Sequence, residues 1–383
     1  MELVLNPRVR IRRDGETLWV QTPDPERGLQ THVVSLERDR ALFDTVVSIM
    51  APDQSAIELD DAMWDRLGEI GLVVPAASAA PDLTFACELP RAATDRAAPR
   101  IAHPQLVVQR GPELPAAIAN LLRGASLPLA AQFPIAWVTD PITGVPAPYA
   151  VTGRHATALD GLHAGQPAPV DLADDLRADL AAADILVGPD FVERRAAAWE
   201  SQLRDAERSY AERGWAIVRG LLPAAQLPAM RAYFRAYVAA GYARRGDHQV
   251  PLRWSGHNQH FVSLIHAGLD RVMSRIAGCP TKPSYSYFAS YMPGAVLKRH
   301  RDRAQCKYSV SLQLDATPDG RAPWPLQLDD LRGEPGAGLL EPGDGLFYRG
   351  CDLWHWRDAL PAGQTSTSAF LHYVDRDFTG DLS

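Results

Sequence analysis

The triplet His300-Arg301-Asp302 places an imidazole and a carboxylate two residues apart, within the stretch AVLKRHRDRAQCKYSVSLQLD at residues 295–315. The runs AVLKRHRD and KYSVSLQLD both predict β-strands. Because side chains alternate across a strand, His300 and Asp302 are expected on one face and Arg301 on the other. An imidazole nitrogen and a carboxylate oxygen can then reach a common point, which is the beginning of a metal site.

His355 is the best candidate for a third ligand. It lies in GDGLFYRGCDLWHWRDAL, after a Gly-Asp turn and an aromatic strand. In a jelly roll this later strand returns beside the earlier one, so His355 is expected next to His300 and Asp302. Two histidines and one carboxylate on one face form the ligand set of non-haem Fe(II) oxygenases, which leaves positions open for a substrate and O₂.

The elements that must position these ligands are short strands in residues 201–383. Runs such as SYSYFASYM, GLFYRG and STSAFLHYVD are separated by Pro, Gly or Asp turns. Many short strands with little helix between them indicate an antiparallel sandwich or jelly roll. Upstream of them, AAAWESQLRDAERSYAERGWAIVRGLLPAAQLPAMRAYFRAYVAAGY predicts a helix, a strand at Trp215 to Arg219 and a second helix. We therefore expect a double-stranded β-helix (jelly-roll) barrel with buttressing helices, within an α+β chain.

Residues 1–80 predict a small α+β domain of winged-helix-like pattern. VRIRRDGETLWVQT forms two alternating runs around Asp14-Gly15, a strong hairpin signal. SLERDRALFDTVVSIM predicts a helix with Ser35 as its N-cap, and ELDDAMWDRLGEIGLVVP predicts a second helix ending at Gly71, followed by a short strand. This pattern resembles the small peptide-recognition domains found beside peptide-modifying enzymes.

Residues 81–200 predict a linker and a helical bridge. ASAAPDLTFACELPRAATDRAAPR is rich in Ala and Pro, as linkers are. GPELPAAIANLLRG and DLADDLRADLAAADIL predict short helices, and the second carries acidic residues early, which the helix dipole favours.

The composition narrows the partners and the compartment. A formal net charge of -7 disfavours nucleic acid as a partner. The chain has 4 cysteines and no CxxC pair, which fits a reducing cytoplasm and not a disulfide framework. The start MELVLNPRVRIRRDG lacks an apolar leader, and no run approaches the roughly 20 apolar residues of a membrane span. We expect a cytoplasmic protein without a membrane partner, and no heptad pattern indicates an oligomeric state.

The region from about Ala206 to Val374 resembles the Fe(II)/2-oxoglutarate-dependent oxygenases, including their prolyl-hydroxylase-like and phytanoyl-hydroxylase-like branches. The order HxD, Gly-Asp, aromatic strand, His carries the resemblance, and YAERGWAIVRGLLPAAQLPAMRAYF is similar to the lead-in of the second branch. The resemblance implies Fe(II) held by His300, Asp302 and His355, with 2-oxoglutarate and O₂ as cosubstrates. The implied reaction is hydroxylation of an unactivated C–H bond in an amino acid, a peptide or protein, or a small natural product. Halogenases of this family carry a small residue in place of Asp302, so halogenation is not expected.

The chain departs from this family at the group that binds the distal carboxylate of 2-oxoglutarate. The family has an Arg or Lys downstream of the second histidine and a Ser soon after it, whereas PAGQTSTSAFLHY has Thr365 and Thr367 there. Arg357 is the first replacement candidate, because it shares a strand face with His355 and a guanidinium grips a carboxylate with two nitrogens. A salt bridge from Arg357 to Asp352 or Asp358 is the alternative. Further candidates for cosubstrate binding are Lys307, Arg349, Thr365 and Tyr287.

Two other functions compete with the oxygenase. The first is a cupin-like metal-dependent enzyme that uses no 2-oxoglutarate, which the missing Arg favours. The second is a non-catalytic scaffold whose N-terminal domain binds a peptide. Succinate formation separates the oxygenase from both, and metal-dependent turnover separates the enzyme from the scaffold.

Overall fold

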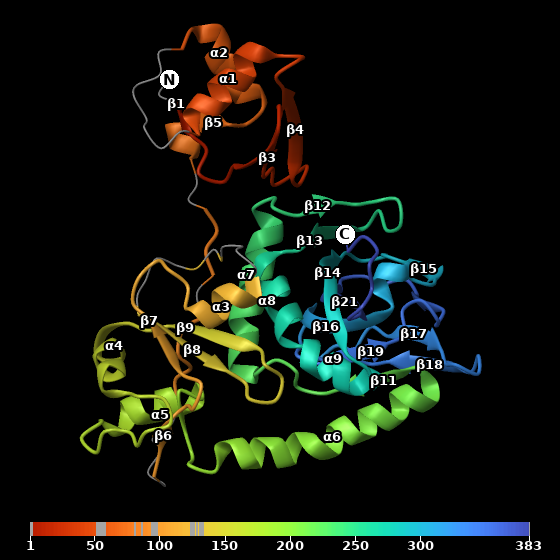
Figure 1. Cartoon of the computed structure of the whole chain (residues 1–383). Coiled ribbons are helices and arrows are strands. Elements are labelled where there is room, and N and C mark those ends of the chain that lie inside the picture. The colour runs from red at the N-terminus through yellow and green to blue at the C-terminus, as the bar shows by residue number, and fades with distance from the viewer. Residues whose placement is uncertain are drawn as a thin grey trace. The chain divides into compact units, whose positions relative to one another are not determined.

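The computed structural model describes residues 3–50, 59–79, 82–85, 87–92, 99–122, 127, 129 and 134–382. The chain divides into two compact units (Figure 1). The smaller unit contains Met1–Leu83 and Phe234–Arg245, and the larger contains Thr84–Tyr233 and Gly246–Ser383. The division into domains at residues 80 and 200 stays a prediction.

The smaller unit is built on a three-stranded antiparallel sheet in the order β2-β3-β4. A second antiparallel pair, β1 with β5, joins the two ends of the N-terminal segment. The buried core lies between the sheet and two helices. The elements are β1 (Leu3–Leu5), β2 (Arg10–Asp14), β3 (Thr17–Thr22), β4 (Gln30–Ser35), α1 (Arg40–Ile49), α2 (Asp61–Glu69), β5 (Val73–Pro75) and β12 (Arg244–Arg245).

The predicted hairpin is confirmed, with Gly15 at a positive φ of 57° in the turn between β2 and β3. The predicted N-cap of the first helix is wrong. Ser35 is instead the last residue of β4, a strand that was not predicted. Helix α1 begins instead after Asp39, whose side chain accepts a hydrogen bond from the backbone N–H of Leu42. Helix α2 ends just before Gly71, as predicted. The winged-helix assignment stays a prediction.

The larger unit begins with a region in which the sequence predicted a linker and short helices. The two helices are present, as α3 and α5, but they accompany a three-stranded antiparallel sheet in the order β7-β8-β9. Strand β9 has the sequence PAPYA, and its prolines are accommodated because it is an edge strand. The elements are β6 (Ile101–Ala102), β7 (Val107–Gln109), α3 (Ala116–Leu122), β8 (Ile135–Thr139), β9 (Pro146–Ala150), α4 (Gly153–Ala158), α5 (Asp174–Ala182) and β10 (Leu186–Val187).

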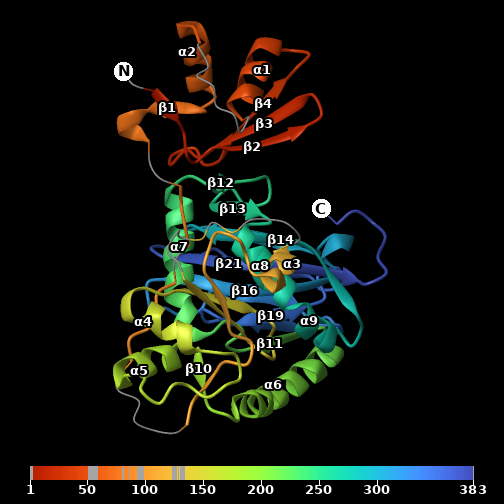
Figure 2. The ribbon, with the colours of Figure 1, turned by 60° about the vertical axis from the view of Figure 1, so that its left-hand side comes forward.

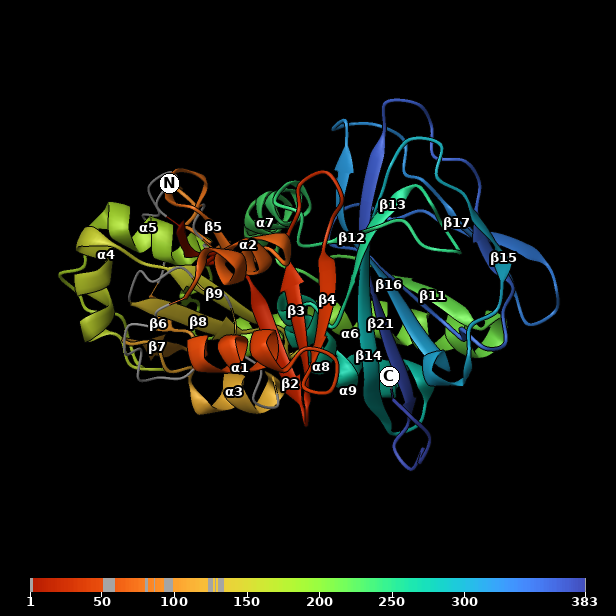
Figure 3. The same cartoon turned by 90° about the horizontal axis from the view of Figure 1, so that it is seen from above.

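The rest of the larger unit contains two antiparallel sheets that face each other (Figure 3). One has the strands β11-β19-β16-β21-β14-β13 in that order, and the other has β15-β20-β17-β18. Apolar side chains from both sheets form one buried core. The strands are β11 (Trp215–Val218), β13 (Arg253–His257), β14 (Thr281–Tyr291), β15 (Leu297–His300), β16 (Tyr308–Thr317), β17 (Leu326–Asp329), β18 (Pro335–Gly338), β19 (Gly345–Tyr348), β20 (His355–Arg357) and β21 (Thr365–Asp375).

Helices cover the outer side of the larger sheet (Figure 2). Helices α8 (His260–Gly268) and α9 (Asp270–Ala277) pack against β14, and α6 (Phe191–Arg213) packs against β11. The predicted order of helix, strand and helix is confirmed by α6, β11 and α7 (Leu227–Ala239). Short 3-10 turns occur at Ala76–Ser78, Leu159–Gly161, Ala224–Gln226 and Ala304–Cys306. Within the described ranges, no helix combines the length and the apolar composition that crossing a bilayer requires.

Candidate metal centre

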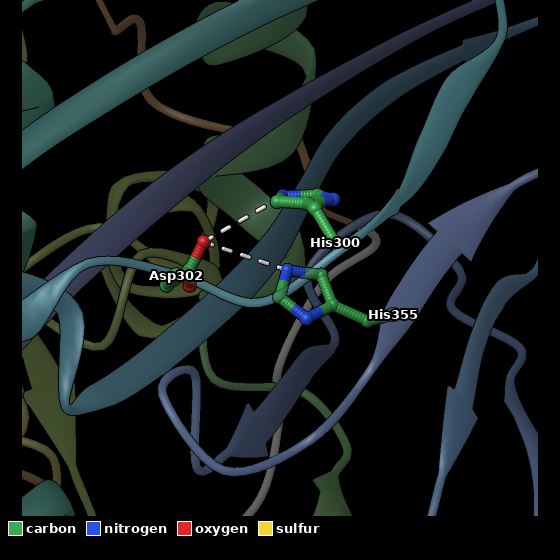
Figure 4. Close-up of side chains that lie close together, drawn as sticks. All are labelled: His300, Asp302 and His355. Carbon is green, nitrogen blue, oxygen red and sulfur yellow. Dashed lines mark ion pairs between the residues drawn. The ribbon is translucent and has the colours of Figure 1, made fainter.

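His300, Asp302 and His355 converge on one point (Figure 4). The Nε2 atoms of His300 and His355 lie 3.6 and 3.5 Å from Oδ1 of Asp302. Two ligands of one metal at bond lengths of about 2.1 Å stand roughly 3 to 3.4 Å apart, so these separations suit a shared ion. His355 is 3% exposed, Asp302 14% and His300 25% in their side chains, so solvent reaches the site on the side of His300.

The elements bring the ligands together by strand pairing. His300 ends β15 and His355 begins β20, and the two residues are directly paired in the antiparallel register. Asp302 lies in the turn after β15, so the prediction that it continues the strand is wrong. Its backbone N–H donates to the carbonyl of Gly350 at 2.9 Å, which turns the chain away from β15 while the carboxylate stays beside the histidines.

Both histidines present a free nitrogen to the common point. Nδ1 of His300 lies 2.8 Å from the carbonyl oxygen of Lys298, and Nδ1 of His355 lies 3.0 Å from that of Leu353. A carbonyl can only accept, so each Nδ1 carries a proton, and Nε2 is the nitrogen of each ring that is left to bind a metal. This is the tautomer in which histidines bind metals, with the other nitrogen held by a hydrogen bond.

The electrostatics of the site favour a cation. Burial, with the charge of His355, lowers the pKa of His300, so the ring is neutral near pH 7. Burial opposes ionisation of Asp302, but the hydrogen bond and charge of His355 outweigh it and hold the carboxyl pKa below its usual value. A carboxylate and two imidazole nitrogens are the donor set that a divalent transition metal prefers.

Ser309 and His372, for which the sequence offered no signal, lie beside the second carboxylate oxygen of Asp302. Ser309 Oγ lies 3.3 Å from Asp302 Oδ2 and 2.9 Å from His372 Nδ1. Asp302, Cys306 and His372 also offer donor atoms within 4.8 Å of one another. Burial lowers the pKa of His372 to about 4 and raises that of the Cys306 thiol to about 12. The Cys306 thiol lies 3.0 Å from the hydroxyl of Tyr285.

Arg357 lies two residues after His355 on β20 and is 1% exposed. Its Nη1 donates to the carbonyl oxygen of Trp324 at 2.7 Å, and its guanidinium stacks on the Trp324 ring at 4.6 Å. Its Nε and Nη2 are buried without a hydrogen-bond partner among the described residues. Burial lowers the Arg357 pKa. Among the described residues its guanidinium makes no ion pair, so the alternative salt bridge to Asp352 or Asp358 is not formed.

The other predicted cosubstrate contacts are engaged elsewhere. Lys307 forms an exposed ion pair with Asp375, and the guanidinium of Arg349 stacks on the Tyr210 ring at 5.4 Å. The hydroxyl of Thr365 lies 2.6 Å from that of Thr317. Tyr287 donates to Asp247 Oδ2 at 3.2 Å. The structure therefore brings together His300, Asp302 and His355, with Arg357 on the strand of His355.

No protein-family model and no curated protein matches the chain. Solved structures match a little under half of it. A Pseudomonas putida prolyl-4-hydroxylase is 20% identical, with a TM-score of 0.38 over 45% of this chain and 99% of that one. The non-haem α-ketoglutarate-dependent carbocyclase SnoK from nogalamycin biosynthesis is 15% identical, with a TM-score of 0.40 over 47% and 87%.

HygX from Streptomyces hygroscopicus, solved with nickel and 2-oxoglutarate bound, is 12% identical, with a TM-score of 0.36 over 46% of this chain and 88% of that one. These similarities concern the fold of part of the chain. The matched structures are thus a prolyl-4-hydroxylase, an α-ketoglutarate-dependent carbocyclase and a protein solved with 2-oxoglutarate bound.

Proposed function

We propose that the protein is an Fe(II)- and 2-oxoglutarate-dependent oxygenase. Its reaction is hydroxylation of an unactivated C–H bond in an amino acid, a peptide or protein, or a small natural product. The observation that carries the proposal is the convergence of three metal-binding atoms from His300, Asp302 and His355, each within 4.8 Å of the others. Because both Nε2 atoms face Oδ1 of Asp302 while each Nδ1 is held by a carbonyl, the three side chains can hold one Fe(II) from one side and leave the other side open.

The winding of the chain supports this proposal. Strand β14 lies in the larger sheet and β15 in the smaller, and the strands then alternate between the sheets through β16, the pair β17 and β18, β19, β20 and β21. Two facing antiparallel sheets wound in this way form a jelly roll, whose interior holds ligands. His300 and His355 come from the β15–β20 pair, and Asp302 follows β15 by two residues.

Arg357 is the group we assign to the distal carboxylate of 2-oxoglutarate. A guanidinium stays protonated, and burying it without a counter-ion is costly. Two of its nitrogens lack a partner in the part of the chain that the structure describes, and the core around it contains Tyr291, Trp324 and Tyr348, which bring no negative charge. A carboxylate that binds both nitrogens would satisfy them together, in the fork geometry that arginine favours.

Ser311 offers a second contact for the same carboxylate. It is fully buried, and its hydroxyl has no partner among the described residues. The register of β16 pairs it with Leu346 on one side and Phe370 on the other. Both belong to the core between the sheets, so Ser311 also points into the barrel interior. Arg357 on one sheet and Ser311 on the other would hold one anion between them.

Fe(II) with bound 2-oxoglutarate and O₂ would supply the oxidant for an unreactive C–H bond. The chain's own residues hold the metal, orient the cosubstrate and exclude water. His355 and Arg357 are almost completely buried, at 2% and 1% exposed, which leaves the approach on the side of His300 to the substrate.

The test is an anaerobic titration of the Fe(II)-loaded protein with 2-oxoglutarate, followed by the visible metal-to-ligand charge-transfer band. We expect the band in the wild type, its loss in His355→Ala, and a much higher 2-oxoglutarate concentration for half-saturation in Arg357→Met. Lys307→Met and Arg349→Met are the matched controls and should titrate like the wild type. Iron binding without a band would favour the cupin-like enzyme, and no iron binding would favour the scaffold.

A further inference from the structure

The two carboxylate oxygens of Asp302 have separate partners. Oδ1 faces the Nε2 atoms of His300 and His355. Oδ2 faces away from them and lies 3.3 Å from the hydroxyl of Ser309. A free carboxylate can rotate and bind a metal through both oxygens, so the partner of Oδ2 decides how many positions Asp302 occupies on the ion.

Ser309 and His372 form a chain of hydrogen bonds that ends at Oδ2. The two residues are directly paired on β16 and β21, and Ser309 Oγ lies 2.9 Å from His372 Nδ1. When Nδ1 donates to Oγ, the single proton of the serine hydroxyl is shared between Asp302 Oδ2 and the carbonyl oxygen of Cys306, which lies 3.2 Å away. The carbonyl of His372 accepts from His266 Nε2 at 2.7 Å and from Ser284 at 2.9 Å, which fixes the backbone from which the imidazole projects.

Gly350 closes the remaining side of the carboxylate. A Cβ at this position would lie 2.5 Å from Asp302 Oδ2 and 2.8 Å from Ser309 Oγ, and it would also meet the carbonyl of Cys306. The backbone of Gly350 therefore packs directly against the oxygen that Ser309 binds. With its carbonyl accepting from the Asp302 N–H, Gly350 leaves Oδ2 no room to swing on that side.

We propose that His372 and Ser309 are positioning residues that hold Asp302 as a one-oxygen ligand, with Oδ2 tied back and Oδ1 left for the metal. This inference rests on the proposed metal site and goes beyond it. With Asp302 bound through one oxygen, each of the three side chains would occupy one coordination position on the ion, and the other positions would stay open. Hydrogen-bonded partners of metal ligands set the orientation of the ligand and tune affinity in this way.

The alternative for these residues is a second metal site. Asp302, Cys306 and His372 have donor atoms within 4.8 Å of one another, and a thiolate, an imidazole and a carboxylate can bind Zn²⁺ or Co²⁺. We favour positioning because Ser309 already bonds to two of the three, and the Cys306 thiol is engaged by Tyr285.

Co²⁺ binding tests the proposal without 2-oxoglutarate or turnover. The titration follows the visible absorption of the protein-bound ion in the wild type, Ser309→Ala, His372→Phe and His372→Asn. We expect about 10- to 100-fold weaker binding and an altered visible spectrum in the first two variants. His372→Asn should bind nearly like the wild type, because the asparagine amide keeps a donor where Nδ1 was. Ser286→Ala is the matched control, since Ser286 is a fully buried serine on β14 bonded to Ser263.

Two results would overturn the inference. One is Co²⁺ binding in Ser309→Ala and His372→Phe with the affinity and spectrum of the wild type. The other is an intense sulfur-to-cobalt band in the wild type that Cys306→Ser removes, which would show the second donor set binding metal. Thermal unfolding of each variant separates a folding defect from loss of orientation. A different result would count against the proposed metal site itself: Co²⁺ binding that is unchanged in His355→Ala.

Discussion

His300 and His355 face each other across the β15–β20 pair, with ring centroids 4.2 Å apart and ring planes at 52°. Each ring is fixed by an Nδ1 hydrogen bond to the carbonyl two residues earlier in the chain, at Lys298 and Leu353. The same backbone pattern on two neighbouring strands therefore presents two equivalent nitrogen donors. Asp302 completes the set from the turn that follows β15.

Metal binding should stabilise the folded protein through these three side chains. An ion that binds only the native state adds about 2.7 kcal/mol at a hundred times its dissociation constant. We expect added Fe²⁺ or Co²⁺ to raise the thermal unfolding midpoint of the wild type, and EDTA to reverse the rise. His355→Ala and Asp302→Ala should lose this response. A response retained in both variants would place the metal elsewhere.

Arg357→Met should weaken 2-oxoglutarate binding without lowering the stability of the ligand-free protein. The guanidinium is buried with two nitrogens that have no hydrogen-bond partner within the described ranges, and each such buried polar group costs about 1 to 3 kcal/mol. The methionine variant loses one hydrogen bond to Trp324 but also loses this penalty. We therefore expect the free energy of unfolding of the ligand-free variant to equal or exceed that of the wild type.

The same variant should lose the stabilisation that 2-oxoglutarate gives to the metal-loaded wild type. Chemical denaturation with and without 2-oxoglutarate measures both effects in one experiment. An Arg357 that serves only the fold would give the reverse pattern, with a less stable variant whose response to 2-oxoglutarate is intact.

The sequence predicted that His300, Asp302 and His355 lie together because their signal is local. An HxD pair beside a strand, and a histidine after a Gly-Asp turn and an aromatic strand, can be recognised without knowing which strands pair. Ser309, His372 and Gly350 lack such a signal. Ser309 meets His372 only through the register of β16 and β21, and Gly350 meets Asp302 only where two turns touch. One slipped residue in either strand would have separated them.

The fold shows the same limit. The hairpin at Gly15 follows from turn chemistry, and the many short strands predicted two facing sheets. Strand β4 was missed because the residues that follow it, with their apolar spacing, favoured a helix from Ser35 onward. The pairing of β4 with β3 along its whole length overrides that preference.

Gly350→Ala should weaken metal binding, although the substitution adds only one methyl group. Gly350 has no positive φ, so alanine meets no backbone strain there. Its Cβ would instead collide with the Cys306 carbonyl, Asp302 Oδ2 and Ser309 Oγ. Such overpacking typically costs about 1 to 3 kcal/mol, and here it also displaces the ligand carboxylate.

We expect a lower unfolding midpoint and a reduced Co²⁺ affinity for this variant. Gly111→Ala is the matched control, because Gly111 also lacks a positive φ and a Cβ there would meet no atom within 4 Å. Equal Co²⁺ affinity in Gly350→Ala and Gly111→Ala would contradict the assigned contact.

Asp247 should make the stability of the protein fall in acid. Its Oδ2 bonds to the Arg253 guanidinium at 2.6 and 2.9 Å and accepts from Tyr287. Burial raises the pKa of Asp247, but the backbone N–H of Val250, with Arg253 and Tyr287, outweighs it and holds the pKa below its usual value. A carboxyl whose pKa is lower in the folded state contributes its full stability above its unfolded pKa of about 3.9, and that contribution is lost as the pH falls through the folded pKa.

Asp247→Asn should remove this part of the pH dependence. The free energy of unfolding, measured from pH 7 down to acid, should fall less steeply below about pH 4 in the variant than in the wild type. At pH 7 the variant should be less stable by up to about 3 kcal/mol, the lower end of the range for breaking a buried ion pair, because Arg253 is 6% exposed and is left buried without its carboxylate partner. Parallel acid profiles for the two proteins would show that the Asp247–Arg253 pair does not control stability, and that the acid sensitivity arises from other carboxylates.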